Sequence, residues 1–254
     1  MAQLANRPSA LWRTLSFLLA LALLGGICAG AFALLDYQWQ WSLAGSYWRL
    51  FWDGWLTTLG IAALALPLSC LIGLIFAGAR RSPWLPVRDF ARIYVELTRG
   101  TPLLVQIFIL WYAFGEKLST DYRLLSGALI LSLFEGAYIS EIFRAGIESI
   151  GTSQLETARS LGFNRAQTYR YVIFPQALRQ SLPPLAGQFA SIIKDSSLLS
   201  VLGISEFSLA ASQVNSITYT TFEIYLPVAL GYLILTLPIS LWTQRLEARS
   251  RFET

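Results

Sequence analysis

Histidine is absent from this sequence, and cysteine occurs only as Cys28 and Cys70. Both cysteines fall inside apolar runs, so the sequence excludes a disulfide framework and any metal site built from histidine and cysteine. No glycine is followed by lysine, which excludes a phosphate-binding P-loop. We therefore expect a chain with no catalytic residue, no metal and no cofactor of its own.

Charged residues are also scarce. They make up 13% of the 254 residues, whereas 55% are hydrophobic; a soluble domain carries about 25% charged residues. This composition predicts a membrane protein, surrounded by lipid. The net charge is +4, but the basic residues cluster between apolar runs, which argues against nucleic acid as a partner.

The long apolar runs predict an all-α integral membrane protein with six transmembrane helices. Crossing about 30 Å of hydrocarbon takes roughly 20 apolar residues. Runs of this kind cover Leu15–Leu35, Gly54–Ala79, Phe90–Gly115, Leu124–Ile150, Pro183–Ile204 and Phe222–Leu246. A secretory signal is the competing interpretation of the first run, but the apolar region of a signal has only about 7–15 residues. We interpret this run as an uncleaved first helix.

An aromatic-rich segment separates the first helix from the others. Between Asp36 and Asp53 the sequence contains four tryptophans and two tyrosines, and such rings favour the headgroup layer of a membrane. We expect this segment to lie at the membrane surface. The chain then divides into residues 1–46, which hold one transmembrane helix and the interfacial segment, and residues 47–254, which hold five.

The distribution of Lys and Arg predicts the orientation in the membrane. Six spans place both termini on one side, and the connections on that side hold fourteen of the 19 basic residues. The opposite side holds three, Arg49, Lys117 and Arg123. Because cytoplasmic connections carry the excess of Lys and Arg, we expect both termini and residues 151–182 to be cytoplasmic.

The polar connection Gly151–Leu182 carries sharp local signals. Ser153 and Glu156 have the spacing of a capping box, which predicts a helix start there. Gly162 is placed to end that helix in the left-handed conformation. Asn164 begins a second capping box, with Gln167 as its partner, and Pro175 is expected to interrupt the second helix.

Leu155, Ala158 and Leu161 give the first of these helices one apolar stripe. The connection is therefore expected to form a compact unit of helix, glycine and helix that is held rigidly against something else. An ordinary structured loop is the alternative interpretation of the same spacing.

This connection resembles the "EAA loop" of the membrane subunits of bacterial ABC importers. The resemblance is carried by Glu156-Thr157-Ala158, Gly162 and Ile173-Phe174-Pro175, although Thr157 replaces an alanine and Phe174 a leucine. Other blocks are similar to the polar amino-acid permeases, and they are Glu96–Phe108, Gly136–Ile150, Phe174–Pro184 and Ile192–Glu206. The resemblance covers roughly Tyr47 to Leu246.

The resemblance implies an ABC importer type-1 core of five helices with a cytoplasmic coupling helix, in a multi-pass protein of the bacterial inner membrane. It implies a dimer of permease subunits, identical or homologous, together with ABC ATPase subunits and an extracytoplasmic substrate-binding protein. ATP and Mg²⁺ would bind to the ATPase. Residues implied in coupling are Ser153, Glu156, Ala158, Gly162 and Pro175.

Charged residues inside apolar runs are candidates for a transport pathway. Glu96 and Arg99 are three residues apart and are expected to share a helix face, whereas Lys194 and Asp195 point about 100° apart. One interpretation is that these charges hold the spans together. The other is a polar cavity for the ammonium and carboxylate of an amino acid, with Thr101 and Ser196 supplying hydroxyls. Arg99-Gly100-Thr101-Pro102 is expected to break its helix there.

Glu135 falls near the middle of the fourth span and departs from the permease pattern, in which this position is small or neutral. Its carboxylate is expected to be paired with Arg99 or Lys194, to be protonated, or to face the pathway and favour a basic amino acid. Glu141 and Arg144 are expected to form a structural pair beside the EAA-like loop.

The function predicted from these observations is the permease subunit of an ATP-driven importer for a polar amino acid, with basic amino acids among its expected substrates. The alternative is a secondary amino-acid transporter or channel that works without an ATPase. An intramembrane enzyme is a poor third interpretation, since the sequence lacks histidine and has no cysteine pair outside the spans.

Overall fold

The computed structural model describes residues 10–34, 37–115 and 123–250. All regular elements in these ranges are helical. Contacts divide the chain into two units, Met1–Trp41 and Ser42–Thr254, whereas the sequence placed the division after residue 46. Each unit is described here by itself.

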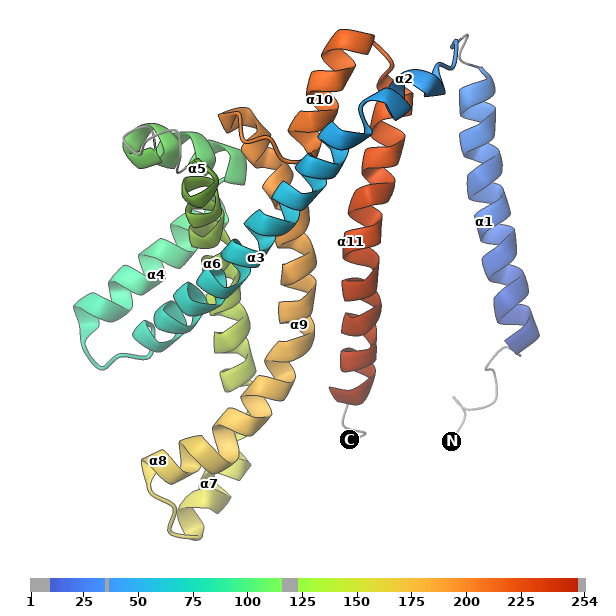
Figure 1. Ribbon diagram of the computed structural model, residues 1–254. Helices are drawn as coiled ribbons and strands as arrows, with labels where there is room; N and C mark the ends of the chain where they lie inside the picture. The colour runs from blue at the N-terminus through green and yellow to red at the C-terminus, as the bar shows by residue number, and fades with distance from the viewer. Residues whose placement is uncertain (1–9, 35–36, 116–122, 251–254) are drawn as a thin grey trace. The chain divides into compact units, whose positions relative to one another are not determined.

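The first unit consists mainly of helix α1 (Ala10–Ala33), drawn in blue in Figure 1. Between Thr14 and Ala33 it is long and apolar enough to cross a membrane, and this stretch buries none of its residues inside the protein. The apolar side chains of α1 therefore have the exposure expected of a helix surrounded by lipid.

The second unit contains the remaining helices. These are α2 (Trp41–Ser46), α3 (Trp48–Ala79), α4 (Leu85–Gly100), α5 (Leu103–Leu110), the π turn η1 (Trp111–Gly115), α6 (Arg123–Glu148), α7 (Thr152–Ser160), α8 (Arg165–Thr168), the π turn η3 (Tyr169–Ile173), α9 (Phe174–Asp195), the 3₁₀ helix η4 (Ser196–Leu202), α10 (Phe207–Thr218) and α11 (Thr221–Ser250). Of the aromatic segment predicted to be interfacial, Asp36 lies outside the described residues, residues 37–40 are not helical, and the rest forms α2 and the first turns of α3.

The described part of the chain has four helices that meet the length and composition of a membrane span, namely α1, α3, α6 and α11. Two bent pairs meet it together. One joins α4 to Leu103–Phe114 at 116°, and the other joins Arg165–Leu202 to α10 at 50°. Counting each pair as one span gives six, the number predicted from the sequence.

The sharp bend between α4 and α5 lies at the predicted helix break. Thr101 has an extended backbone, with φ −123° and ψ 147°, as expected for a residue before proline. Its hydroxyl donates to the Leu97 carbonyl at 2.9 Å and accepts from the Gln106 side chain at 2.7 Å. These bonds replace part of the helical ladder that Pro102 interrupts.

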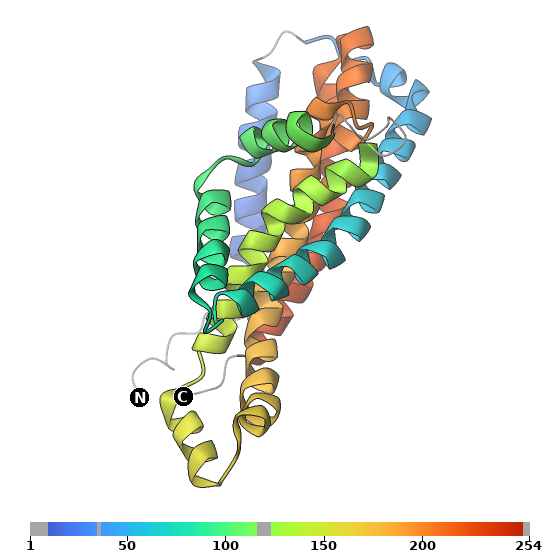
Figure 2. The same ribbon diagram turned by 90° about the vertical axis from the view of Figure 1, so that its left-hand side faces the viewer.

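Helices α3 and α6 pack along most of their length, as Figure 2 shows. A Cβ at Gly73 would lie 2.5 Å from Cγ2 of Ile139, and a Cβ at Gly136 would lie 2.5 Å from Cγ2 of Ile72. Each helix therefore places an isoleucine on a glycine of its neighbour. This exchange allows the two backbones to approach closely, which is how helices associate where lipid offers no hydrophobic driving force.

The main apolar core extends this contact to other helices. It joins Ile61 and Ala65 of α3, Ile107 of α5, Leu131 of α6 and Leu199 of η4, all of which are fully buried or nearly so. The Ser132 hydroxyl bonds the Ala128 carbonyl of its own helix at 2.5 Å and lies 3.2 Å from the Ala65 carbonyl. The core thus holds α5 and η4 against the α3–α6 pair.

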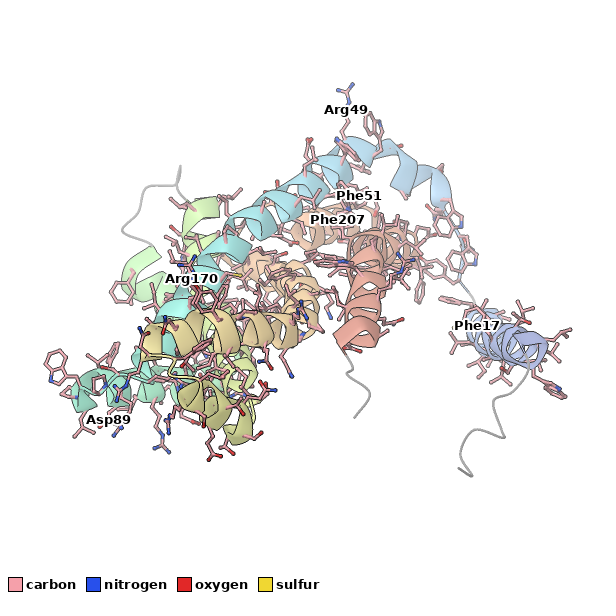
Figure 3. All side chains as sticks on the ribbon, turned by 90° about the horizontal axis from the view of Figure 1, so that it is seen from below. Phe17, Arg49, Phe51, Asp89, Arg170 and Phe207 are labelled. Carbon is pink, nitrogen blue, oxygen red and sulfur yellow. The ribbon has the colours of Figure 1, made fainter. Side chains whose placement is uncertain are left out.

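A second cluster fixes α10 at the other end of α3. The buried Glu206 carboxylate caps α10 by accepting the backbone N–H groups of Ser208 and Leu209, at 2.8 and 2.7 Å, and it also accepts the Tyr232 hydroxyl at 2.9 Å. The rings of Phe51 and Phe207 meet edge to face with centroids 6.4 Å apart (Figure 3). The Glu206 carboxylate therefore connects α10 to α11 through its hydrogen bonds.

The glycine contact between α3 and α6 makes a prediction about stability. Replacing Gly73 by alanine should destabilise the protein by about 1–3 kcal/mol, the usual range for overpacking, because the new methyl group overlaps Ile139. Gly60→Ala is the matched control on the same helix, since apart from the adjacent backbone of α3 no described atom lies within 4 Å of its Cβ position. It should be neutral or stabilising by up to about 1 kcal/mol. Thermal unfolding of the purified variants in detergent measures the difference, and equal midpoints would contradict the packing argument.

Candidate coupling segment and membrane cavity

Helix α7 begins two residues earlier than the sequence predicted. Its N-cap is Gly151, and no side chain caps it, so the predicted capping box of Ser153 and Glu156 is wrong. Ser153 lies inside the first turn, where its backbone carbonyl accepts the Thr157 hydroxyl at 2.8 Å. Both Ser153 and Glu156 remain exposed on the outer surface of the segment.

The predicted end of α7 is confirmed. Gly162 has φ +77°, a left-handed conformation that glycine adopts without the usual penalty. The N–H of Phe163 donates to the Ala158 carbonyl at 3.0 Å, and the N–H of Gly162 donates to the Arg159 carbonyl at 2.9 Å. These two bonds form a Schellman motif, which reverses the chain toward α8.

Helix α8 begins with the second predicted capping box. The Asn164 side chain accepts the Gln167 N–H, and the Gln167 side chain accepts the Asn164 N–H, both at 2.9 Å. The α-helix is interrupted before Pro175, as predicted, by the π turn Tyr169–Ile173, which leads directly into α9. Proline has no N–H for the Tyr171 carbonyl, and the wider turn lies where that bond is missing.

The segment of α7, α8 and η3 lies beyond the last turn of α6 and the first turn of α9 (Figure 1). Ile150, Ile173 and Ala177 form a buried apolar cluster there, with Leu155 of α7 packed against it. A Cβ at Gly146 would lie 3.0 Å from the Ala177 carbonyl, so α6 and α9 cross closely at this level. The segment is therefore attached to both helices by apolar contacts as well as through the chain.

The residues predicted to act in coupling divide by exposure. Ala158 is buried, with 3% of its surface exposed, which places it on the inner side of α7. Ser153, Glu156, Gly162 and Pro175 are exposed. The Leu161 side chain is also 70% exposed, so the outer surface of the segment combines polar groups with an apolar one.

Three arginines from three helices converge on Glu141 of α6. Its carboxylate accepts Nη1 of Arg80 at 2.5 Å and Nε of Arg144 at 3.1 Å, and Nη1 of Arg99 lies 3.9 Å away. The predicted pair of Glu141 and Arg144 is confirmed and extended. Arg99 turns to Glu141, and no ion pair joins it to Glu96 within the described ranges. One carboxylate therefore joins the ends of α3 and α4 to α6.

A cavity of about 450 Å³ lies beside this cluster, between α6 and α9. Its polar lining comes from Arg99, Glu141, Ser149, Gln180 and Gln188. The Arg99 guanidinium lies 5.4 Å from the centre of the Tyr138 ring, which also lines the cavity. The cavity thus presents a cation, a carboxylate, neutral hydrogen-bonding groups and an aromatic face.

Glu135 lies behind the cavity wall. Its side chain is fully buried, and one carboxylate oxygen accepts the amide of Gln188; the other has no hydrogen-bond partner among the described residues. Its neighbour across the contact is Asp195 of α9. The expected pairing of Glu135 with Arg99 or Lys194 is therefore wrong, because the chain places an amide and a second acid beside it.

The remaining predicted pathway residues are not brought together in this cavity. The Thr101 hydroxyl is bonded within its own turn, and the buried Ser196 hydroxyl donates to the Ile193 carbonyl at 2.8 Å. Lys194 is exposed and forms no ion pair within the described ranges. Asp195 is half-buried beside Glu135.

Sequence reasoning missed Tyr138, Gln180 and Gln188. For Gln188 a signal was present, because Ser181, Gln188 and Asp195 follow one another at intervals of seven residues. Such spacing places polar groups on one face of a helix, two turns apart. That face of α9 carries the groups that meet Gly146 and Glu135 of α6.

A chain whose described elements are all helices, with up to six spans, an exposed helical segment between two of them and a polar cavity beside that segment, has the architecture of a multi-spanning membrane permease. Residues 69–252 match the family described as the inner membrane component of binding-protein-dependent transport systems. The chain belongs to this family.

Individual relatives agree with this assignment. The chain is 35% identical over 217 residues to the glutamine transport system permease protein GlnP of Escherichia coli K12, covering 84% of this chain and 99% of that one. It is 34% identical over 200 residues to the probable glutamine ABC transporter permease protein GlnM of Bacillus subtilis, covering 79% and 93%. A chain in the crystal structure of an amino acid ABC transporter with histidines is 35% identical, with a TM-score of 0.77 over 84% of this chain and all of that chain. The fold is that of the ABC importer type-1 permeases.

Glu141 is the acceptor on which this site depends, and its removal should be costly. Glu141→Gln leaves Arg80 and Arg144 without their shared carboxylate, and hydrogen bonds to charged groups contribute about 1.5–3 kcal/mol each. We expect a loss of about 2–3 kcal/mol of stability. Glu148→Gln is the control, because that side chain is 51% exposed and, among the described residues, forms an ion pair with Arg144 only; such exposed pairs contribute about 0–1 kcal/mol. Thermal unfolding in detergent would contradict this ranking if both variants melted alike.

Proposed function

We propose that this chain is the membrane-spanning subunit of an ATP-driven importer for a polar amino acid. Two such permease subunits, identical or homologous, would form the pathway. Two ATPase subunits, which bind ATP and Mg²⁺, and an extracytoplasmic substrate-binding protein complete the assembly. The relatives named for glutamine transport and the similarity to an amino acid ABC transporter support this proposal. The chain itself carries translocation and no covalent chemistry.

The observation that carries the proposal is the attachment of the α7–α8 segment to two membrane helices. Its outer surface is exposed, while its inner side packs on Ile150, Ile173 and Ala177. A force applied by an ATPase to the outer surface would therefore reach α6 and α9 together. Closure of two ATPases would open the pathway outward, and ATP hydrolysis would let it relax inward, which is alternating access.

The proposed orientation places the α7–α8 segment and both termini in the cytoplasm. It is supported by the excess of Lys and Arg on that side of the spans, fourteen against three. This is the side on which a cytoplasmic ATPase could reach the segment, and the family description refers to an inner membrane component.

The cavity between α6 and α9 is the proposed substrate site. Arg99 is the most accessible of the three arginines around Glu141, since 41% of its side chain is exposed, so it is the group available for the α-carboxylate of an amino acid. Glu141 and the amides of Gln180 and Gln188 are placed to bind an ammonium or a polar side chain.

A preference for basic amino acids is the narrower part of the proposal. Glu135 and Asp195 lie behind Gln188 without a cation beside them in the described ranges. A cationic substrate group in the cavity would supply the missing positive charge. In general, two opposite unit charges roughly 8 Å apart attract by about 2 kcal/mol at an effective dielectric constant of about 20.

The coupling proposal is tested at Gly162. Valine is strained at positive φ, whereas asparagine enters the left-handed region readily, and the Cβ position itself has no atom within 4 Å. We expect Gly162→Val to lose most substrate-stimulated ATP hydrolysis and uptake in proteoliposomes containing the whole complex, and Gly162→Asn to keep most of both. Both variants should insert into the membrane. Normal uptake by Gly162→Val, or uptake by the permease without any ATPase, would contradict the proposal.

The substrate site is tested by comparing Arg99 with Glu135. Arg99→Gln should weaken uptake of every amino acid tenfold or more, because it removes the partner of the common carboxylate; a charge-assisted hydrogen bond contributes about 1.5–3 kcal/mol. Glu135→Gln should weaken uptake of arginine by about 2 kcal/mol, or roughly 30-fold, and hardly change uptake of glutamine. Competition uptake in proteoliposomes measures both. An equal loss for arginine and glutamine in Glu135→Gln would assign that residue to structure alone.

A further inference from the structure

A second polar cavity lies at the turn between α3 and α4. It adjoins the proposed substrate site, because Arg80 and Arg144 of its lining bind Glu141, which lines that site. It has a volume of about 350 Å³ and is lined entirely by charged side chains. Five are arginines, namely Arg80, Arg81, Arg88, Arg92 and Arg144, and three are carboxylates. Asp89, one of these carboxylates, marks the place in Figure 3.

The arginines of this cavity are not fully neutralised. Arg80 pairs with Glu141, and Arg144 pairs with Glu141 and Glu148. Arg88 lies 4.0 Å from its neighbour Asp89, and both side chains are about half exposed. Arg81 and Arg92 are exposed and form no ion pair within the described ranges. Glu96 also lines the cavity, but the five arginines outnumber the three lining carboxylates. Arg81 and Arg92 therefore remain available for an anion.

The cavity lies at the level where a membrane span ends. No charged residue occurs between Asp53 and Arg80, so α3 reaches the edge of the hydrocarbon at its last turn. Trp84 follows in the turn and is 68% exposed, as tryptophan is in the headgroup layer. The guanidinium groups beside it are at the depth of lipid phosphates.

Helix α4 connects this cavity to an apolar surface. One face of the helix is buried through Ala91, Val95 and Thr98. A second face carries Arg88, Arg92 and Glu96, which line the cavity. The third face exposes apolar side chains, with Phe90 at 67%, Ile93 at 57% and Leu97 at 63%. A charged face at the edge of the hydrocarbon beside an exposed apolar face is suited to contact with the headgroup and the acyl chains of one lipid.

We propose that this cavity binds the headgroup of an anionic phospholipid, with the lipid phosphate held by Arg81 and Arg92 and the acyl chains lying along the Phe90, Ile93 and Leu97 face of α4. The adjacent hydrophobic face favours a lipid over a soluble anion, because inorganic phosphate would use the arginines alone. It also favours a lipid over an acidic surface of the ATPase, which would leave the apolar side chains uncovered.

The experiment measures lipid binding to the purified full-length protein in detergent by native mass spectrometry. The probes are phosphatidylglycerol, which is anionic, and phosphatidylcholine, which is zwitterionic. A basic residue near an anionic membrane surface contributes about fivefold in affinity, so Arg81→Gln combined with Arg92→Gln should weaken phosphatidylglycerol binding about 30-fold and leave phosphatidylcholine unchanged. Arg49→Gln combined with Arg245→Gln removes the same charge elsewhere and should bind phosphatidylglycerol like the wild type.

Three further measurements decide the outcome. Arg81→Lys combined with Arg92→Lys should retain most of the affinity for phosphatidylglycerol, which separates loss of charge from misfolding. Stabilisation by millimolar inorganic phosphate equal to that by phosphatidylglycerol would overturn the proposal in favour of a soluble anion. If Arg81→Gln combined with Arg92→Gln lost association with the ATPase while lipid binding was unchanged, the proposal would be overturned in favour of a protein contact.

Discussion

The close contact of α3 with α6 is the constraint on which the rest of the structure depends. Gly73 and Gly136 each accept an isoleucine from the facing helix, and no other residue would leave room for it. Because the two helices approach so closely, Arg80 at the end of α3 can reach Glu141 on α6 at 2.5 Å. The apolar packing of α3 on α6 thus determines where the charged side chains of the arginine cluster meet.

The same helix α6 serves two further purposes toward its end. Its contact with α9 at Gly146 brings the α7–α8 segment under both helices, and its polar face forms one wall of the cavity that contains Glu141 and Tyr138. Any tilt of α6 relative to α9 would therefore change the shape of the cavity and the position of the segment together. Coupling between the two needs no separate relay of side chains.

Much of this arrangement could be predicted from the sequence, because it depends on local chemistry. Apolar runs identify the spans, Gly162 and Asn164 identify the cap geometry, and Thr101-Pro102 identifies the break between α4 and α5. The partners of buried charges could not be predicted, since they depend on which helices meet. A pairing with Arg99 or Lys194 was one of three alternatives for Glu135, which lies instead beside Gln188 and Asp195. The sequence prediction misplaced the start of α7 because Ser153 and Glu156 have the spacing of a capping box. The helix instead begins after Gly151, and no side chain caps it.

The π turn between α8 and α9 determines how α9 is rotated about its own axis relative to the segment before it. A π turn holds one residue more than an α-helical turn, and each residue of an α-helix rotates the chain by about 100°. Deleting one residue from Tyr169–Ile173 would restore an ordinary helix and turn α9 by that angle relative to the segment before it. Gln188 and Asp195 would then face away from Glu135. The additional residue of the π turn before Pro175 therefore sets the rotational register of α9 and keeps the polar face of that helix aligned with α6.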